Sequence, residues 1–315
     1  MVAGAGKADA PMRLLLTAGT ATARKLAEML AARLAARMDE VEIIYSLAGL
    51  TDAPRLPEHP HIRVRQGGFG GVEGLAAWLE REGIAAVIDA THPFARRMPH
   101  QVAEAARLAG VPHARFLPPA PALPVSCFLA SRASVSRASL PSLIRQSMAE
   151  ASCIRCLPDV RGKPGHDSEA GRYLGLVDSL TDLTQALPRG ARVVVALGSR
   201  GVAVLRSRSD LHLHARMLMP PAFIPPPRWR LLTGRKAGAP RGSLVGEMAW
   251  LRATRAQWLL ARQSAGSHAL VLAALRLGVN VLLQRRPAPP PGALVLRQPE
   301  EVEDWLRRIL PVDRA

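Results

Sequence analysis

A short polar loop, Asp89-Ala90-Thr91-His92-Pro93, directly follows the apolar run at 84–88. Carboxylate, hydroxyl and imidazole groups placed so close together can orient a polar ligand or move a proton. In an open α/β sheet, ligands bind beyond the carboxyl ends of the strands, so the loop's position predicts a functional site. Taken alone, these residues also allow a simpler interpretation, in which Asp89 caps the next helix and His92 is a hydrogen-bonded loop residue.

A glycine-rich loop precedes this strand, at Gly67, Gly68, Phe69, Gly70 and Gly71. The stretch between loop and strand has Leu75, Trp78 and Leu79 at helical spacing, which predicts a short amphipathic helix. The order is therefore glycine loop, helix, buried strand and polar loop, an order typical of an α/β unit that binds a ligand.

The first strand and its turn have a dinucleotide-binding layout without the complete GxGxxG fingerprint. Residues 13–17 predict a buried strand, Gly19 and Thr20 form the following turn, and a helix is expected from about 24 to 38. Gly19 permits close backbone approach, and Thr20 can cap the helix and face a phosphate. A second strand at 41–45 leads to Ser46 and Gly49, where the ribose of a dinucleotide would lie.

The C-terminal half repeats the strand-and-turn pattern. Strands are expected at 192–197 and 279–283, and helices at about 180–187, 268–277 and 300–310. The turn after 192–197 contains Ser199 and Arg200, and it could hold an anion or could equally be a packing turn. His212 and His214 alternate on a further strand, where a solvated face is more common than a metal site, so no metal site is predicted.

Composition narrows the class of protein. The 315 residues are 48% apolar, and Lys plus Arg exceed Asp plus Glu by 42 − 25 = 17. The positive charge suits a polycarboxylate ligand or nucleic acid, and equally fits an Arg-rich background composition. Aromatic residues are only 4%, too few for stacking on single strands, and no run is long enough to span a membrane. Three cysteines favour a reducing compartment, and a cytoplasmic location is expected.

Two segments fall outside these patterns. Residues 1–11 predict a disordered leader without the features of a signal peptide. Residues 121–170 are rich in Ser, Arg, Ala and Pro, contain all three cysteines and predict an insertion or linker that is largely disordered. The Cys153-Ile-Arg-Cys156 motif in this segment lacks a second pair, so a metal or redox role is not expected.

The glycine loop and the string Asp89-Ala-Thr-His-Pro-Phe-Ala95, at this spacing, resemble the precorrin-6A reductase family, which includes cobalt-precorrin-6A reductases. The resemblance covers about 12–120 and 172–311, and it matches 257–266 to a strand of the family that ends in a polar loop suited to an anion. It implies reduction of precorrin-6A to precorrin-6B by hydride transfer from NADPH, in cobalamin biosynthesis. It also implies a polycarboxylated tetrapyrrole as the substrate, with neighbouring pathway enzymes as further candidate partners.

The resemblance implies a role for each candidate residue. The nicotinamide end of the cofactor site is assigned to Thr91 and His92 as the catalytic residues. The residues assigned to the dinucleotide are Gly19, Thr20, Arg24, Ser46, Gly49, Gly67, Gly68, Phe69, Gly70 and Asp89. Those assigned to the carboxylates of the substrate are Arg241, Arg262, Ser264, Gly266 and Arg286.

The chain also departs from the family pattern. Leu50 stands where the family generally has an arginine that would suit the extra phosphate of NADPH, and Arg55 is a possible substitute. The family commonly has a lysine in the helix after Gly266, and none lies between 267 and 280. Three alternatives therefore stay open: a preference for the cobalt-loaded substrate, an inactive paralogue that only binds, and a basic nucleic-acid-binding protein.

The expected fold is α/β, with two doubly wound, Rossmann-like domains and the active site in the cleft between them. The N-terminal dinucleotide-binding domain is expected over 12–120. The C-terminal substrate domain is expected over 171–315 and is predicted to be the smaller or more degenerate of the two.

Overall fold

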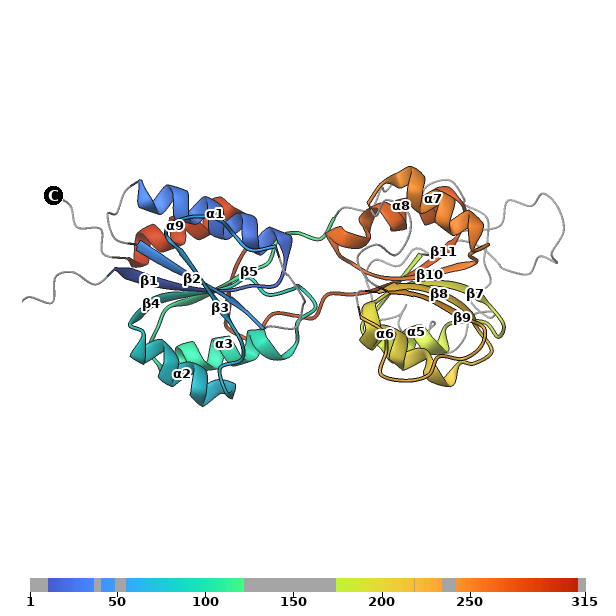
Figure 1. Cartoon of the computed structure of the whole chain (residues 1–315), viewed down its shortest axis with the longest axis horizontal. Helices are drawn as coiled ribbons and strands as arrows, with labels where there is room; N and C mark the ends of the chain where they lie inside the picture. The colour runs from blue at the N-terminus through green and yellow to red at the C-terminus, as the bar shows by residue number, and fades with distance from the viewer. Residues whose placement is uncertain are drawn as a thin grey trace, which may run out of the picture. The chain divides into compact units, whose positions relative to one another are not determined.

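The computed structural model describes residues 11–36, 41–48, 55–121, 174–217, 219–233 and 242–310 (Figure 1). The chain forms two compact units. One unit combines residues 1–119 with residues 287–315, and the other consists of residues 120–286.

The first unit is a six-stranded parallel sheet in the order β12-β5-β4-β1-β2-β3, with helices on both faces. Figure 1 shows α1 and α9 on one face of this sheet and α2 and α3 on the other. Its strands are β1 (Met12–Thr17), β2 (Val41–Leu47), β3 (Ile62–Gln66), β4 (Ile84–Asp89), β5 (His113–Phe116) and β12 (Leu294–Leu296). Its helices are α1 (Ala21–Ala35), α2 (Gly71–Arg81), α3 (Arg97–Leu108) and α9 (Pro299–Ile309).

The second unit repeats this architecture in the order β6-β11-β10-β7-β8-β9. In Figure 1, α7 and α8 cover one face of its sheet and α5 and α6 the other. Its strands are β6 (Leu174–Val177), β7 (Arg192–Ala196), β8 (His212–Met217), β9 (Trp229–Thr233), β10 (Trp258–Arg262) and β11 (Asn280–Gln284). Its helices are α5 (Leu180–Gln185), α6 (Gly198–Val204), α7 (Leu244–Ala253) and α8 (His268–Arg276), with short 3-10 turns η3 (Leu205–Ser207) and η4 (Ala265–Ser267).

Each sheet adds one edge strand to a run of five strands: β12 joins β1–β5, and β6 joins β7–β11. Both sheets have the strand order of a dinucleotide-binding fold, in which a sixth strand completes one edge. In the first unit this edge position is filled by β12, which pairs with β5, while β6 pairs with β11 in the second unit. The α/β fold with two doubly wound sheets is thus as predicted.

The predicted C-terminal domain boundary is wrong. Residues 171–315 were expected to form one domain, whereas residues 287–315 belong to the first unit. The reason is packing: Val302, Trp305 and Leu306 of α9 bury their side chains in the same core cluster as α1. The second unit is also not degenerate, because its sheet has six strands like the first.

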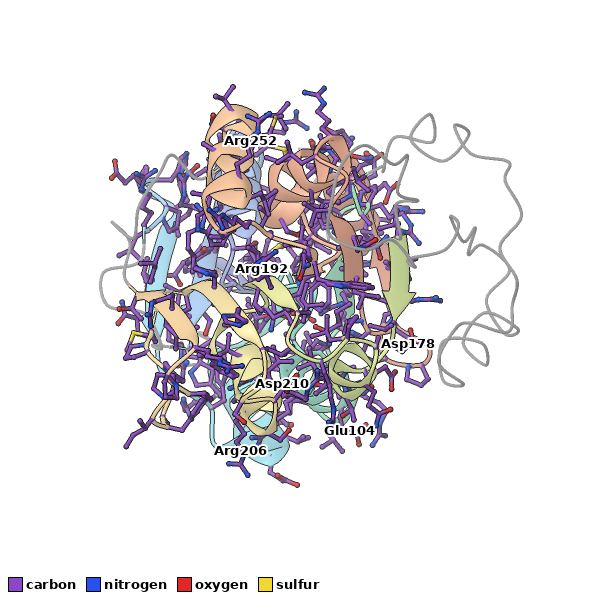
Figure 2. The ribbon with its side chains drawn as sticks, turned by 90° about the vertical axis from the view of Figure 1, so that its right-hand side faces the viewer. Glu104, Asp178, Arg192, Arg206, Asp210 and Arg252 are labelled. Atoms are coloured by element: carbon purple, nitrogen blue, oxygen red, sulfur yellow. The ribbon has the colours of Figure 1, made fainter. Side chains whose placement is uncertain are left out.

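Buried apolar strands account for both sheets. The side chains of Leu14, Leu15 and Leu16 are fully buried, as are those of Leu259, Leu260 and Ala261 in the second unit. A parallel sheet covered by helices on both faces requires such continuous apolar runs, and they are the runs from which these strands were predicted. Figure 2 views the second unit, with Arg252 of α7 and Arg206 of η3 on opposite sides of the sheet and Arg192 at the start of β7.

Several predictions fall outside the described residues. They concern most of the leader at 1–11, almost all of the segment at 121–170 with its cysteines, and the positions of Gly49 and Arg241. Within the described ranges, no helix is long and apolar enough to cross a membrane, and no group of three or more His, Cys, Asp or Glu residues could hold a metal ion. His212 and His214 share one face of β8, as predicted.

Candidate active site

The carboxyl ends of β1 and β4 meet at the centre of the first sheet, where the chain changes the direction of its crossovers. Asp89 lies here and is 1% exposed. Its Oδ1 accepts hydrogen bonds from the Thr17 hydroxyl at 3.0 Å, the Thr91 amide at 3.0 Å and the Thr91 hydroxyl at 2.7 Å. Asp89 therefore fixes the conformation of the polar loop from inside the fold.

Arg115 of β5 completes this cluster. Its guanidinium forms an ion pair with Oδ2 of Asp89, and the two side chains are 3% and 1% exposed. The same Nη1 lies 3.4 Å from the Thr91 hydroxyl. The sequence shows Arg115 only as a residue at a strand end, because the pairing depends on the neighbouring positions of β4 and β5 in the sheet. Both Asp89 oxygens are thus engaged within the protein, and Asp89 supports the candidate site through Thr91.

Thr91 and His92 differ in exposure. Thr91 is buried, whereas the next residue, His92, is exposed to solvent. The Phe94 amide donates to Nδ1 of His92 at 3.1 Å, and the Ala95 amide donates to the His92 carbonyl at 2.7 Å. Because Nδ1 accepts a hydrogen bond, the neutral ring carries its proton on Nε2. The loop thus fixes both the position and the tautomer of the imidazole.

The turn after β1 has the expected cap. Gly19 has a φ of 153°, and Thr20 is the N-cap of α1, where its hydroxyl accepts from the Ala23 amide at 3.0 Å. The other amides of this first helical turn are available to an anion beyond the helix end. Arg24 pairs with Glu28 at 2.7 Å on the same helix.

The glycine loop is held by Arg65, which sequence reasoning missed. Its guanidinium donates to the carbonyl of Gly67 at 2.7 Å and to that of Gly68 at 2.8 Å. The cation also lies 3.7 Å from the ring centroid of Phe69, a cation–π contact, and 3.5 Å from the Ser46 hydroxyl. The partial burial of Arg65 lowers the pKa of its guanidinium.

Glycine is required at two positions around this loop. Gly70 has a φ of 83° and precedes α2 as its N-cap residue. A Cβ at Gly74 would lie only 2.0 Å from the carbonyl oxygen of Phe69. The first turn of α2 therefore packs directly on the backbone of the loop. The Gly67 amide donates to the Leu47 carbonyl at 3.0 Å, so the loop begins next to the end of β2, where Ser46 lies.

In the second unit, the turn after β10 has the predicted polar residues. The Ser267 hydroxyl bonds to the Arg262 carbonyl and to the Ser264 carbonyl, and it lies 3.1 Å from the Ser264 hydroxyl. Arg286, after β11, donates from Nε to the Gln263 carbonyl at 2.9 Å. Arg262, Ser264 and Arg286 are therefore brought together at the carboxyl ends of two adjacent strands.

Charge accumulates at this end of the second sheet. Burial lowers the pKa of Arg262, and the nearby positive charge of Arg200, in the first turn of α6, lowers it further. Two guanidinium groups close enough to interact in this way favour an anion between or beside them. Arg200 and Arg262 thus give the site a positive potential.

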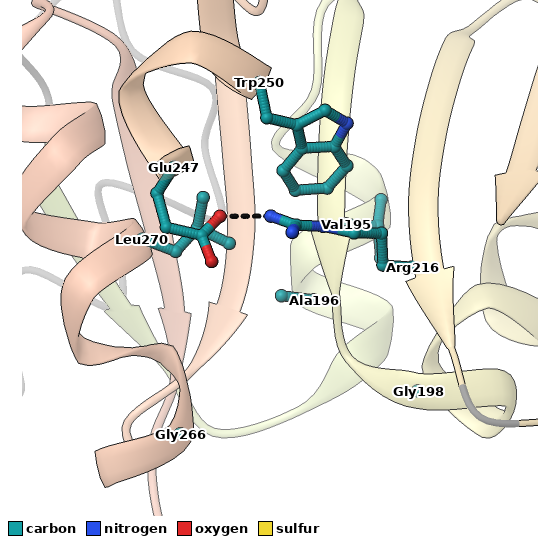
Figure 3. Close-up of a pocket in the computed structure, with 8 residues that line it drawn as sticks. All are labelled: Val195, Ala196, Gly198, Arg216, Glu247, Trp250, Gly266 and Leu270. Atoms are coloured by element: carbon teal, nitrogen blue, oxygen red, sulfur yellow. Dashed lines mark hydrogen bonds and ion pairs between the residues drawn. The ribbon is translucent and has the colours of Figure 1, made fainter. Parts of the chain in front are cut away.

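A small cavity lies near the same strand ends and was not predicted (Figure 3). Its volume is about 160 Å³, and it lies between Arg216 of β8, Glu247 and Trp250 of α7, and Gly266 of η4. Gly266, which the resemblance assigns to the substrate, lines this cavity. Arg216 forms a buried ion pair with Glu247. The alternation of β8 contains the signal for Arg216, since a charged residue there shares the face of His212 and His214.

Together these features define a class of protein: a two-unit α/β protein with a dinucleotide-type turn in one sheet and cationic strand ends in the other. The chain belongs to the precorrin-6x reductase CbiJ/CobK family, whose model matches residues 13–307. The recognition from the glycine loop and the Asp89–Ala95 string is confirmed.

Similar proteins cover nearly the whole chain. Precorrin-6A reductase from Rhodococcus erythropolis is 31% identical over 283 residues, 89% of this chain and 91% of the relative. The precorrin-6A reductase of Sinorhizobium sp. is 31% identical over 287 residues, 89% of this chain and 87% of the relative. A solved CobK precorrin-6A reductase matches with a TM-score of 0.67 and 26% identity, over 95% of this chain and 97% of that structure.

Proposed function

We propose that the protein reduces precorrin-6A, or its cobalt-loaded form, to the corresponding precorrin-6B with NADPH, in corrin ring biosynthesis. The observation that carries this proposal is full-length membership of the reductase family, from residue 13 to residue 307, with both sheets intact. Full coverage matters because the proposed dinucleotide residues belong to the first unit and the proposed substrate residues to the second.

The first unit fits a dinucleotide. The turn at Gly19 and Thr20 offers the amides of a long helix to a phosphate, and its glycine lets the ligand approach the backbone. Ser46 is the penultimate residue of β2 and lies near the loop that begins at Gly67, where an adenosine ribose would lie. Arg24 and Arg65 add positive charge around these strand ends, which favours NADPH with its additional phosphate over NADH.

When bound, the nicotinamide would supply a hydride to a carbon of the substrate's conjugated system, and a proton would be added to a ring nitrogen. The residues of the chain position the reactants for this step. Asp89 and Arg115 hold Thr91 in place, and the Phe94 amide keeps the imidazole proton of His92 on Nε2. That arrangement suits His92 for donating a hydrogen bond or a proton at Nε2.

The second unit offers cations to the substrate. We assign its carboxylates to Arg241, Arg262 and Arg286, with Ser264 and Gly266 forming the intervening turn. The close approach of Arg200 to Arg262, and the net charge of +17, would attract a polyanion of this kind.

The test is anaerobic oxidation of NADPH by the purified protein with precorrin-6A, repeated with cobalt-precorrin-6A and with NADH. The expected result is a loss of NADPH absorbance together with a shifted tetrapyrrole spectrum, with NADPH preferred over NADH. Saturable binding of both ligands without any turnover would overturn the proposal and identify a binding protein. DNA retention that weakens steeply with salt would instead support the nucleic-acid alternative.

A further inference from the structure

Arg216 is a buried arginine with only part of its hydrogen-bonding capacity used. Its side chain is 7% exposed, and its Nη2 forms the ion pair with Glu247, whose side chain is 6% exposed. The guanidinium lies 3.6 Å from the ring centroid of Trp250, one turn further along α7. Figure 3 shows the cation between the indole and the carboxylate. Its position is therefore fixed on two sides.

The other terminal nitrogen, Nη1, is buried and has no hydrogen-bond partner among the residues that the structure describes. In Glu247, Oε2 bonds to Nη2 and Oε1 accepts from the Gly242 amide at 3.3 Å, and neither oxygen bonds to Nη1. A buried donor left without an acceptor costs about 1–3 kcal/mol, and more when it is charged. Such a group in a preformed pocket indicates a ligand that supplies the acceptor.

The cavity that Arg216 lines is small, and its lining is both polar and apolar. Its volume is about 160 Å³. Val195, Ala196 and Leu270 contribute apolar surface, and Gly198 and Gly266 leave the walls without side chains. A ligand group that fits has a short aliphatic stem and a terminal acceptor.

The surrounding charge selects an anionic acceptor. Arg216 and Glu247 together are neutral, and two further cations lie nearby, Arg200 in the first turn of α6 and Arg262 at the end of β10. A carboxylate accepts strongly from a guanidinium and is a better match for Nη1 than a neutral carbonyl.

We propose that this pocket binds one short carboxylate-bearing side arm of the substrate, with the carboxylate on Nη1 of Arg216 and the stem against Val195, Ala196 and Leu270. The assignment of the arm to the substrate rests on the proposed function, whereas the carboxylate site itself does not. Arg216 then acts as a substrate-anchoring residue that the family resemblance did not indicate.

The first experiment uses the full chain and needs no turnover. Trp250 stacks on Arg216, so its fluorescence reports on the pocket, and Trp250→Phe identifies its part of the signal. Sodium propionate should change the emission saturably, with a Kd on the order of millimolar, whereas propionamide should not change it. Arg216→Met should abolish the response, and Arg252→Gln, an exposed position on the same helix, should keep it. If Arg216→Met does not fold, Arg216→Lys retains a charge for Glu247 while removing the second nitrogen.

A response to propionamide equal to that of propionate, or a response that survives loss of Arg216, would overturn the carboxylate site. A response to inorganic phosphate alone would overturn it in favour of a phosphate site. The second experiment measures substrate KM, which should rise at least about tenfold in Arg216→Lys with the Kd for NADPH unchanged. An unchanged substrate KM in an active enzyme would show that the side arm does not bind in this pocket. Propionate binding that needs Arg216 in a protein without reductase activity would support the site while the proposed function fails.

Discussion

The guanidinium of Arg115 and the carboxylate of Asp89 form an ion pair inside the first unit, with side chains 3% and 1% exposed. The pair links the carboxyl ends of β4 and β5, and Asp89 passes the constraint on to Thr91 through two hydrogen bonds. The loop that holds His92 is therefore attached to the sheet by charge as well as by its backbone.

Replacing Arg115 with Met should lower the free energy of unfolding by about 3–5 kcal/mol, because it leaves the Asp89 carboxylate buried without its partner. Urea unfolding followed by circular dichroism measures this loss. The double variant Arg115→Met with Asp89→Asn should recover part of it, since the uncompensated charge is gone. Arg107→Met, which removes an exposed ion pair with Glu104, is the matched control and should change little. If Arg115→Met and Arg107→Met lowered the free energy of unfolding equally, burial of the Asp89–Arg115 pair would not explain its contribution.

Arg65 should matter for cofactor binding more than for stability. Arg65→Gln removes the bonds to two loop carbonyls and the stacking on Phe69, so the loop must be ordered when the ligand binds. We expect the Kd for NADPH, from quenching of protein fluorescence, to rise roughly tenfold. Arg63→Gln, on the same strand but paired with Glu42 and Glu82, should leave the Kd unchanged. A normal Kd in Arg65→Gln would mean that the glycine loop is ordered without this residue.

Substitution by alanine should lower stability at Gly74 but hardly affect it at Gly68. Gly74→Ala places a Cβ 2.0 Å from the Phe69 carbonyl oxygen, so α2 or the loop must shift. The expected cost is about 1–3 kcal/mol in thermal or urea unfolding. For Gly68→Ala, no described atom lies within 4 Å of the new methyl group, and stability should hardly change. A stable Gly74→Ala variant would show that the helix and loop are not packed as tightly as described.

Local patterns predicted the apolar strands and the turn residues but not the pairing of distant segments. The strand β3 was missed because its apolar residues Ile62 and Val64 alternate with arginines on a half-buried edge. The strand β12 has only three residues, and its partner β5 lies far away in the sequence, so nothing local indicates which sheet it joins. The helix α7 was not predicted either, although Ser243 caps it by accepting from the Gly246 amide.

The same limit applies to the candidate site. Thr91, His92 and Ser264 could be proposed from the sequence because each lies in the loop that follows a predicted strand. Arg65 and Arg216 were missed because their importance comes from what they contact: the carbonyls of Gly67 and Gly68 in one case, and Glu247 with Trp250 in the other. Such contacts depend on strand order and register, which the spacing of residues along the chain does not contain.

Arg262 offers a test of which unit binds which ligand. Arg262→Ala should raise the KM for the tetrapyrrole substrate, by roughly tenfold or more, while the Kd for NADPH stays within twofold of the wild-type value. The reason is that Arg262 ends β10 in the second unit, whereas the proposed dinucleotide turn lies in the first. Arg276→Ala, at an exposed position on α8, is the control. An unchanged substrate KM would show that Arg262 does not contact the substrate.

The contact between α9 and α1 in the first unit should make the free energy of unfolding fall at low pH. Glu303 of α9 is buried and bonds to Arg33 of α1 at 2.6 Å, and hydrogen bonding to Arg33 lowers the pKa of the Glu303 carboxyl. A carboxyl whose folded pKa lies below its unfolded value stabilises the fold above the unfolded pKa, about 4.3 for Glu, and loses that contribution as the pH falls through the folded pKa. The free energy of unfolding should therefore fall between about pH 5 and pH 3.

The Glu303→Gln variant should show a smaller fall over this range, because Gln cannot titrate, and a lower stability at pH 7, because the charge-assisted bonds to Arg33 and Arg307 are weakened. Urea unfolding at a series of pH values, at constant ionic strength, measures both effects. Glu104→Gln is the control: Glu104 also has a lowered pKa, through its bond to Arg107, but it lies on the exposed surface of α3. Solvent screens that pair, so its removal should leave the pH profile close to that of the wild type. If Glu303→Gln and the wild type lost stability in parallel down to pH 3, the acid sensitivity would come from other carboxylates, and Glu303 would not be the group that ties α9 to α1.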